Sequence, residues 1–199
     1  SSSDLVRNFL LMRLNMDDQT ELYDKYWSKI EKLFPVQVFS EFLRDYLIVK
    51  KHTYVKVRLV YDDYKRYFEE NGLDSETALS DLYQYAVYYD HLLNANFDDS
   101  KLNKCLRDLI SLGNKDGRPY FLFLVSLAED GKISWDLVDK LISIWESYIV
   151  RLKVLRRSGS STSSTAKLCD IDSLDQSNLS ESLTKAFLSS LMNKFPNDS

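Results

Sequence analysis

Two short clusters of cations are the residues of this sequence best suited to binding chemistry. The first cluster surrounds Tyr54 and consists of Lys50, Lys51, Lys56 and Arg58. The second cluster consists of Arg151, Lys153, Arg156 and Arg157. Cationic side chains of this kind contact nucleic-acid phosphates. They are also typical of a solvated helix end, where cations complement the negative end of the helix dipole. Both interpretations stay open, and the ordinary helix end is the commoner one.

Cysteine and histidine are too sparse to predict a metal centre or a catalytic base. Cys105 and Cys169 lack Cys-x-x-Cys or Cys/His spacing, so neither a disulfide nor a zinc site is predicted. His52 and His91 cannot form a His-Glu-x-x-His pair, and each is expected to be an ordinary helix-end or surface residue. We therefore expect no catalytic, cofactor-binding or metal-binding residue and no cofactor in this segment.

Two segments imitate a calcium-binding loop but fail on their ligands. Around Gly131, Leu137 occupies the position of the bidentate glutamate. The segment that begins at Asp170 and Asp172 has Asp175 in place of the turn glycine. Phosphate-binding patterns such as Gly-x-Gly-x-x-Gly do not occur in the sequence either.

Scarce glycine and proline predict long helices as the elements that position these residues. The chain has 5 Gly and 3 Pro among 199 residues, where average usage would give about 14 and 10. Apolar residues recur at spacings of three and four, as on the buried face of a helix. The predicted helices are 4–14, 18–34, 38–50, 55–70, 75–94, 101–112, 120–129, 135–157 and 178–195. Residues 52–59 also partly alternate like a strand, but no partner strand is visible, so helix is preferred from Val55.

The predicted fold class is all-α, an irregular multi-helix bundle of about eight helices plus a C-terminal helix after a flexible linker. Residues 158–165 are only Ser, Thr and one Gly, and the chain stays polar and acidic to about 177. We therefore predict a helical domain over 1–157, a flexible Ser-rich acidic linker over 158–177, and a C-terminal helix over 178–199. That last helix is expected to pack on the domain or extend from it, with Asn178 and Glu181 forming a capping box.

Charge and hydropathy narrow the class of protein. Twenty-six Lys and Arg against 30 Asp and Glu leave a net charge of −4, so the chain has no global basic field to drive nucleic-acid binding. Its longest apolar run, 120–127, is far shorter than the ~20 residues of a membrane helix. We expect a soluble, cytoplasmic protein with reduced thiols. The first residue is not Met, which suggests a segment of a longer polypeptide.

Several short segments in order carry a family resemblance. They are SDLVRNFLL at 3–11, LYDKYW at 22–27, FSEFLRDYL at 39–47, VYDDYK at 60–65, FLFLVSLAED at 121–130, ESYIVR at 146–151 and FP at 195–196. Together they resemble the helical region that follows the ParB-like N-terminal domain in GmrSD-type, modification-dependent restriction endonucleases of bacteria and archaea. The resemblance spans nearly the whole chain.

The resemblance implies a parent protein with chemistry on both sides of this segment. Such parents have an N-terminal domain with an Asp-Gly-Gln-Gln-Arg-type motif that hydrolyses nucleoside triphosphate, and often a C-terminal His-Asn-His-type nuclease domain. Neither motif occurs here. Arg7, Asn8, Arg44 and Arg151 match the family pattern and are expected to contact the missing domains or DNA. Leu152 stands where the family usually has a second arginine.

Two functions follow as hypotheses. The first is a noncatalytic helical connecting and regulatory segment of a GmrSD-type restriction endonuclease directed against modified foreign DNA, as in defence against phage. Its expected partners are the missing domains and double-stranded DNA, without a membrane, and a homo-oligomer is left open. The second is a helical protein-interaction module with no nucleic-acid role. A free-standing enzyme is the least expected, because no nucleophile, base and orienting group can be assembled from the spacing.

Overall fold

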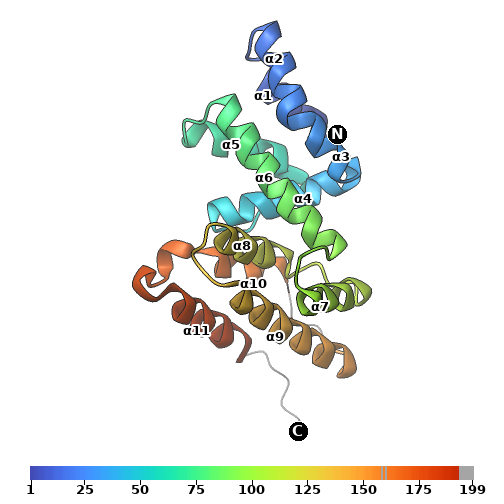
Figure 1. The fold of residues 1–199 in the computed structure, drawn as a ribbon, viewed down its shortest axis with the longest axis vertical. Coiled ribbons are helices and arrows are strands. Elements are labelled where there is room, and N and C mark those ends of the chain that lie inside the picture. The colour runs from blue at the N-terminus through green and yellow to red at the C-terminus, as the bar shows by residue number, and fades with distance from the viewer. Residues whose placement is uncertain (158, 160, 193–199) are drawn as a thin grey trace. The chain divides into compact units, whose positions relative to one another are not determined.

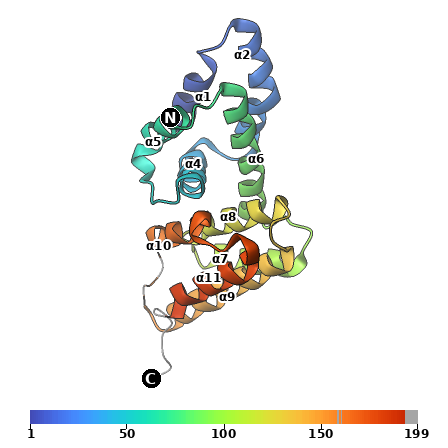
Figure 2. The ribbon, with the colours of Figure 1, turned by 90° about the vertical axis from the view of Figure 1, so that its left-hand side faces the viewer.

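The computed structural model describes residues 1–157, 159 and 161–192, and their regular structure is entirely helical (Figures 1 and 2). This confirms the predicted all-α class. The α-helices are α1 (Ser2–Leu11), α2 (Met16–Leu22), α3 (Ser28–Leu33), α4 (Val36–Lys51), α5 (Val60–Glu70), α6 (Ser75–Asn94), α7 (Ser100–Ser111), α8 (Arg118–Glu129), α9 (Trp135–Val154), α10 (Thr162–Ala166) and α11 (Leu179–Met192). A π-helical turn over Tyr23–Trp27 joins α2 to α3.

The chain forms two compact units, where the sequence predicted one helical domain over 1–157. The first unit contains Ser1–Lys51 and Val55–Asp90, and the second contains His52–Tyr54 and the residues from His91 onward. The boundary falls inside α6, one uninterrupted helix, so no change of composition marks it.

Side chains cap several helix starts, and some helix bounds differ from the predicted ones: α1 begins at Ser2 after Ser1, and the helix predicted over 18–34 is divided between α2, the π-helical turn and α3. Asp99 caps α7 and Ser134 caps α9. Asn15 rather than Asp18 caps α2, because its side chain accepts the hydrogen bond of the Asp18 amide at 2.9 Å. The helix expected from Val55 begins later, with a 3-10 turn over Val57–Leu59 followed by α5.

Three helices end in a Schellman motif with glycine at the left-handed position. After α7, for example, the amide of Gly113 donates to Ile110 O at 2.9 Å and that of Asn114 to Leu109 O at 3.0 Å. Glycine suits this position because a φ of +58° to +69° carries no Cβ penalty there. The residues concerned are Gly72, Gly113 and Gly131.

An aromatic core fills the first unit. Trp27 packs against Phe39 with ring centroids 5.6 Å apart, and Phe42 packs against Tyr89 at 5.3 Å. All four side chains are buried, and the start of α6 is tied to α1 by the Ser75 hydroxyl, which donates to Leu10 O at 2.6 Å. Inclined rings at these distances add to the stabilisation that burial provides.

Helix α8 is the buried centre of the second unit, as its apolar character all round predicted. Every residue from Pro119 to Ala128 is buried. Tyr120 stacks on Phe187 of α11 with centroids 5.3 Å apart, and Phe121 meets Trp145 of α9 edge-on. The helix therefore packs against both α9 and α11.

The segment predicted as a flexible linker contains helical turns that pack on the second unit. It contains α10 and three 3-10 turns, at Lys167–Cys169, Ile171–Ser173 and Gln176–Asn178. Thr165, Ala166 and Cys169 are buried, and the Thr165 hydroxyl donates to Asp116 O at 2.7 Å. These three small buried side chains anchor a segment whose composition alone is typical of a flexible linker. Of the predicted C-terminal helix, residues 193–199 lie outside the described part.

Candidate nucleic-acid interface

Arg7 and Arg44, which carried the family pattern in the first unit, are paired with acids of the same unit. The Arg7 guanidinium lies 3.3 Å from both Asp4 Oδ1 and Glu31 Oε1. Arg44 Nε donates to Asp45 Oδ1 at 2.7 Å, and the Tyr89 hydroxyl donates to Asp45 Oδ2 at 2.9 Å. Asp45 is fully buried, so its charge depends on these partners.

Lys50 and Lys51 are also engaged within the first unit. Lys50 Nζ lies 2.9 Å from Asp81 Oδ1 and 4.3 Å from the centre of the Tyr85 ring. Burial alone would lower the pKa of Lys50, but Tyr85 and Asp81 raise it above its ordinary value, so the ammonium stays charged. Lys51 Nζ lies 3.0 Å from Asp63 Oδ1.

The other predicted contacts of the first unit are exposed. Asn8 is exposed on α1, and its side chain accepts a hydrogen bond from the neighbouring Arg7 at 3.4 Å. Lys56 and Arg58 lie before α5, and neither has an ion-pair partner within 4.0 Å among residues 1–157, 159 and 161–192. The first cationic cluster is thus split into an internally paired half and an exposed half.

The second cationic cluster lies together at the end of α9. Arg151, Lys153, Arg156 and Arg157 are all exposed. Their backbone is fixed, because the Arg156 amide donates to Lys153 O at 3.1 Å and the Arg157 amide to Leu152 O at 2.9 Å. This is the same Schellman geometry that ends α5, α7 and α8.

Arg156 occupies the left-handed position of that motif, with φ of +51°. Glycine fills this position after α5, α7 and α8, whereas His52 and Ala95 share the positive φ after α4 and α6. A left-handed conformation costs a residue with a Cβ about 1 kcal/mol or more. Strained positions of this kind gather at functional sites, where the side chain has a use that offsets the strain.

A small cavity opens beside this helix end. It measures about 250 Å³, and its lining includes Lys153 and Arg157 of the α9 end. Gly113, Asn114 and Asp116 line it from the loop between α7 and α8. Two cationic side chains thus border one concave surface of the second unit, together with the acidic residue Asp116.

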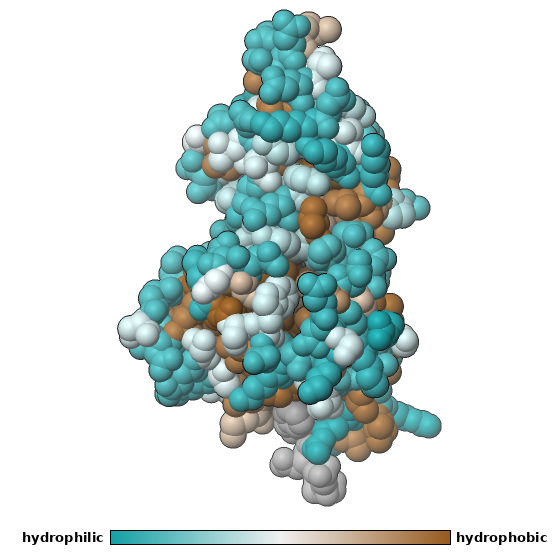
Figure 3. Space-filling model, in the orientation of Figure 1, coloured by the Kyte–Doolittle hydropathy of each residue, from teal (hydrophilic) through white to brown (hydrophobic). Residues whose placement is uncertain are grey.

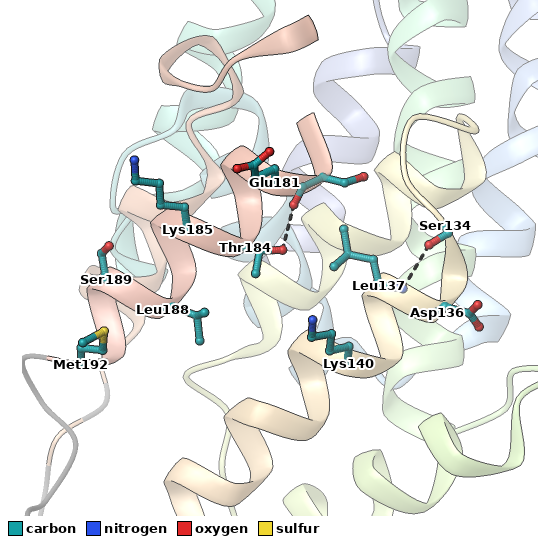
Figure 4. Close-up of a pocket in the computed structure, with 11 residues that line it drawn as sticks. Ser134, Asp136, Leu137, Lys140, Glu181, Thr184, Lys185, Leu188, Ser189 and Met192 are labelled. Carbon is teal, nitrogen blue, oxygen red and sulfur yellow. Dashed lines mark hydrogen bonds between the residues drawn. The ribbon is translucent and has the colours of Figure 1, made fainter. Parts of the chain in front are cut away.

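A second surface of the same unit is an apolar groove between α9 and α11, about 760 Å³ in volume. Figure 4 shows Leu137 and Leu188 in the space between these helices, with Met192 at its end. Lys140 and Glu181 lie on its rim. In the space-filling view, apolar patches of this kind interrupt a mainly hydrophilic surface (Figure 3).

The structure also brings together groups that sequence spacing could not relate. His52 Nδ1 lies 3.3 Å from Asp170 Oδ1, and with Asp172 they form a group whose potential ligand atoms lie within 4.8 Å of one another. The histidine and the two acids are more than a hundred residues apart in the sequence, so no motif could join them. Asp172 is exposed and Asp170 is partly exposed, which is the usual state of solvated acids.

Cys105 and Cys169 are both buried, and neither is part of a disulfide. Cys105 Sγ donates to Glu146 Oε2 at 2.8 Å. Burial, reinforced by that carboxylate, raises the pKa of the Cys105 thiol to about 11. Such a thiol is a poor nucleophile near neutral pH.

Comparison with family models, with curated proteins and with solved structures found no match to this chain. The resemblance to the GmrSD-type helical region therefore remains a prediction. Among the described helices, none has both the length and the apolar character needed to span a bilayer.

Proposed function

We propose that this chain is a noncatalytic helical connecting and regulatory segment of a GmrSD-type restriction endonuclease, and that it contacts DNA phosphates through the cationic end of α9. The single observation that carries the DNA contact is the strained Arg156 among three further exposed cations. The restriction part of the proposal rests on the ordered sequence resemblance.

Internal pairing favours the α9 end over the Lys50–Arg58 cluster. Lys50 and Lys51 would have to leave Asp81 and Asp63 to reach a phosphate, which would strand partly buried carboxylates. Lys153, Arg156 and Arg157 have no ion-pair partner within 4.0 Å in the described part of the chain, so binding DNA through these three side chains breaks no such pair. The net charge of −4 makes the contact local rather than a property of the whole surface.

DNA binding by the full chain tests the proposal. Fluorescence anisotropy with a labelled duplex is expected to show weak, salt-sensitive binding. The K153Q/R156Q/R157Q variant should weaken it by about tenfold or more at ~50 mM salt, since each lost phosphate contact reduces the counterion release that drives binding.

A charge-matched variant supplies the control. K29Q/K32Q/K65Q removes three exposed cations of the first unit and changes the net charge equally. It should bind DNA nearly as the unmodified chain does, while K56Q/R58Q reports on the other exposed cations. Equal losses in all three variants would contradict a specific role for the α9 end.

Sequencing of the gene on both sides of this segment tests the restriction part separately. An upstream domain with an Asp-Gly-Gln-Gln-Arg-type motif is expected. If the upstream sequence lacks it, the link to restriction fails even where DNA binding stands.

The groove between α9 and α11 supports the second candidate, a helical protein-interaction module. An amphipathic partner helix could place apolar residues over Leu137, Leu188 and Met192. Under this alternative the chain binds no DNA even at low salt, and L188E abolishes capture of a defined partner.

A further inference from the structure

A pocket of about 590 Å³ lies in the second unit where four helices begin or end. It is bordered by the last turn of α6, the loop that follows and the start of α7. The end of α8 and the start of α9 complete the border. Its lining consists of His91, Asn96, Phe97, Asp98, Asp99, Ser100, Glu129 and Trp135. This volume is within the range of small-molecule sites.

Three aromatic rings form one part of the lining. The centroids of His91 and Phe97 are 5.5 Å apart with the ring planes at 86°, and those of Phe97 and Trp135 are 5.5 Å apart at 52°. Because neighbouring rings are inclined, the lining presents both ring faces and ring edges.

The loop that carries Phe97 is fixed in place before any ligand arrives. The Phe97 amide donates to Asn103 Oδ1 at 2.8 Å, and Asn103 Nδ2 donates back to Phe97 O at 2.7 Å. A side chain of α7 thus holds both polar groups of one loop residue. Such preorganisation reduces the entropy lost on binding.

The charge of the lining is negative. It contains the carboxylates of Asp98, Asp99 and Glu129, and no lysine or arginine. Asp99 is partly committed, since it accepts the amides of Lys101 and Leu102 as the cap of α7. Asp98 and Glu129 have no ion-pair partner within 4.0 Å among the described residues.

Helix dipoles do not reverse this sign. Two helices, α7 and α9, begin at the pocket, and two, α6 and α8, end beside it. Each terminus contributes about half a charge, positive at a start and negative at an end, so the four contributions nearly cancel. The carboxylates therefore decide the potential.

The pKa of Asp139, one turn after Trp135 on α9, is also affected by the nearby carboxylates. Burial raises the pKa of its carboxyl, and Asp99 raises it further, against the weaker opposite effect of Lys101. A third neighbour, Asp136, acts in the same direction as Asp99. Negative charge is thus concentrated around the start of α9.

We propose that this pocket binds an organic cation, an alkylammonium or guanidinium group. The rings of Phe97 and Trp135 would lie on one side of the cation and the carboxylates of Asp98 and Glu129 on the other. Aromatic faces attract such cations through the ring quadrupole. They supply no ligand atom to a hard metal ion, which needs several oxygens around it. Anions are repelled by the same carboxylates.

Titration of the full chain with small cations tests this assignment. The probes are n-butylammonium, n-butylguanidinium and tetramethylammonium chlorides, compared with neutral n-butanol and anionic butyrate. Tryptophan fluorescence reports binding selectively, because Trp135 is partly exposed whereas Trp27 and Trp145 are 0% and 3% exposed. Saturable changes with Kd on the order of 1 mM are expected for at least one cation, and W135F should abolish them.

Two variants separate the pocket from general charge effects. D98N/E129Q should weaken cation binding at least about tenfold, with an unchanged circular dichroism spectrum. D17N/E70Q, which neutralises two exposed acids of the first unit, should leave binding unaltered. Absence of saturation with every cation, equal binding of n-butanol, or unchanged binding by D98N/E129Q would each overturn the proposal.

Discussion

Among single residues, Arg156 offers a way to distinguish a DNA-binding role of a side chain from a purely structural one, because its backbone has a positive φ. A glycine there would relieve the left-handed strain but would remove a cation from the α9 end. Stability and binding should therefore change in opposite directions.

We predict that R156G stabilises the second unit by about 1 kcal/mol, because glycine adopts a positive φ without a Cβ penalty. The same variant should weaken DNA binding. Denaturant unfolding and anisotropy check the two effects, and R157Q is the control that should weaken binding without stabilising. Greater stability with unaltered DNA affinity would show that Arg156 only closes the helix.

The Cys105 thiol should titrate far above the ordinary range. With a pKa of about 11, its alkylation by iodoacetamide should rise with a midpoint near that pH rather than near 9. E146Q removes the neighbouring carboxylate and should lower the midpoint. Peptide mass spectrometry distinguishes Cys105 from Cys169, and a midpoint at 9 or below in the unmodified chain would contradict the burial and the Glu146 contact.

Individual residue types could be predicted from the sequence, but the partners of their side chains could not. Lys50 was noted as a cation, yet its pairing with Asp81 depends on which helix faces meet. Lys50 and Asp81 are 31 residues apart, so only tertiary packing relates them. The number of cations in the sequence is therefore larger than the number of cationic side chains that are available to contact DNA.

At the scale of elements, apolar periodicity predicted most helices because tertiary packing buries the same faces that the spacing defines. The run 120–128 is an example, since its uniform apolar character corresponds to burial on all sides of α8. Composition alone does not predict the burial seen among the described residues of 158–177. Small polar residues are typical of linkers, but Thr165 and Cys169 are buried, which a composition average does not reveal.

The Thr165 hydroxyl should hold α10 to the loop before α8. T165V preserves shape but leaves Asp116 O without that donor, which should cost about 1–2 kcal/mol locally. Limited proteolysis should then cut 161–178 faster than in the unmodified chain. S163A, at an exposed position of the same helix, should change nothing. Equal cutting of T165V and the unmodified chain would indicate that the segment is not held by this contact.

At the scale of the whole molecule, two helical units share one chain, and each holds part of the predicted contact set. The first unit uses Arg7, Arg44, Lys50 and Lys51 within its own structure, and the second presents the α9 end to solvent. The division itself was not predictable, because α6 crosses it without a glycine, proline or polar run.

Salt dependence of DNA binding distinguishes a phosphate contact at the end of α9 from binding of any other kind. The logarithm of the binding constant should fall linearly with the logarithm of salt concentration, and K153Q/R156Q/R157Q should reduce the slope by about two to three, close to 0.9 per lost phosphate contact. The K29Q/K32Q/K65Q control should keep the slope of the unmodified chain. Identical slopes for all three proteins, or no binding at ~50 mM salt, would contradict a DNA contact at the end of α9.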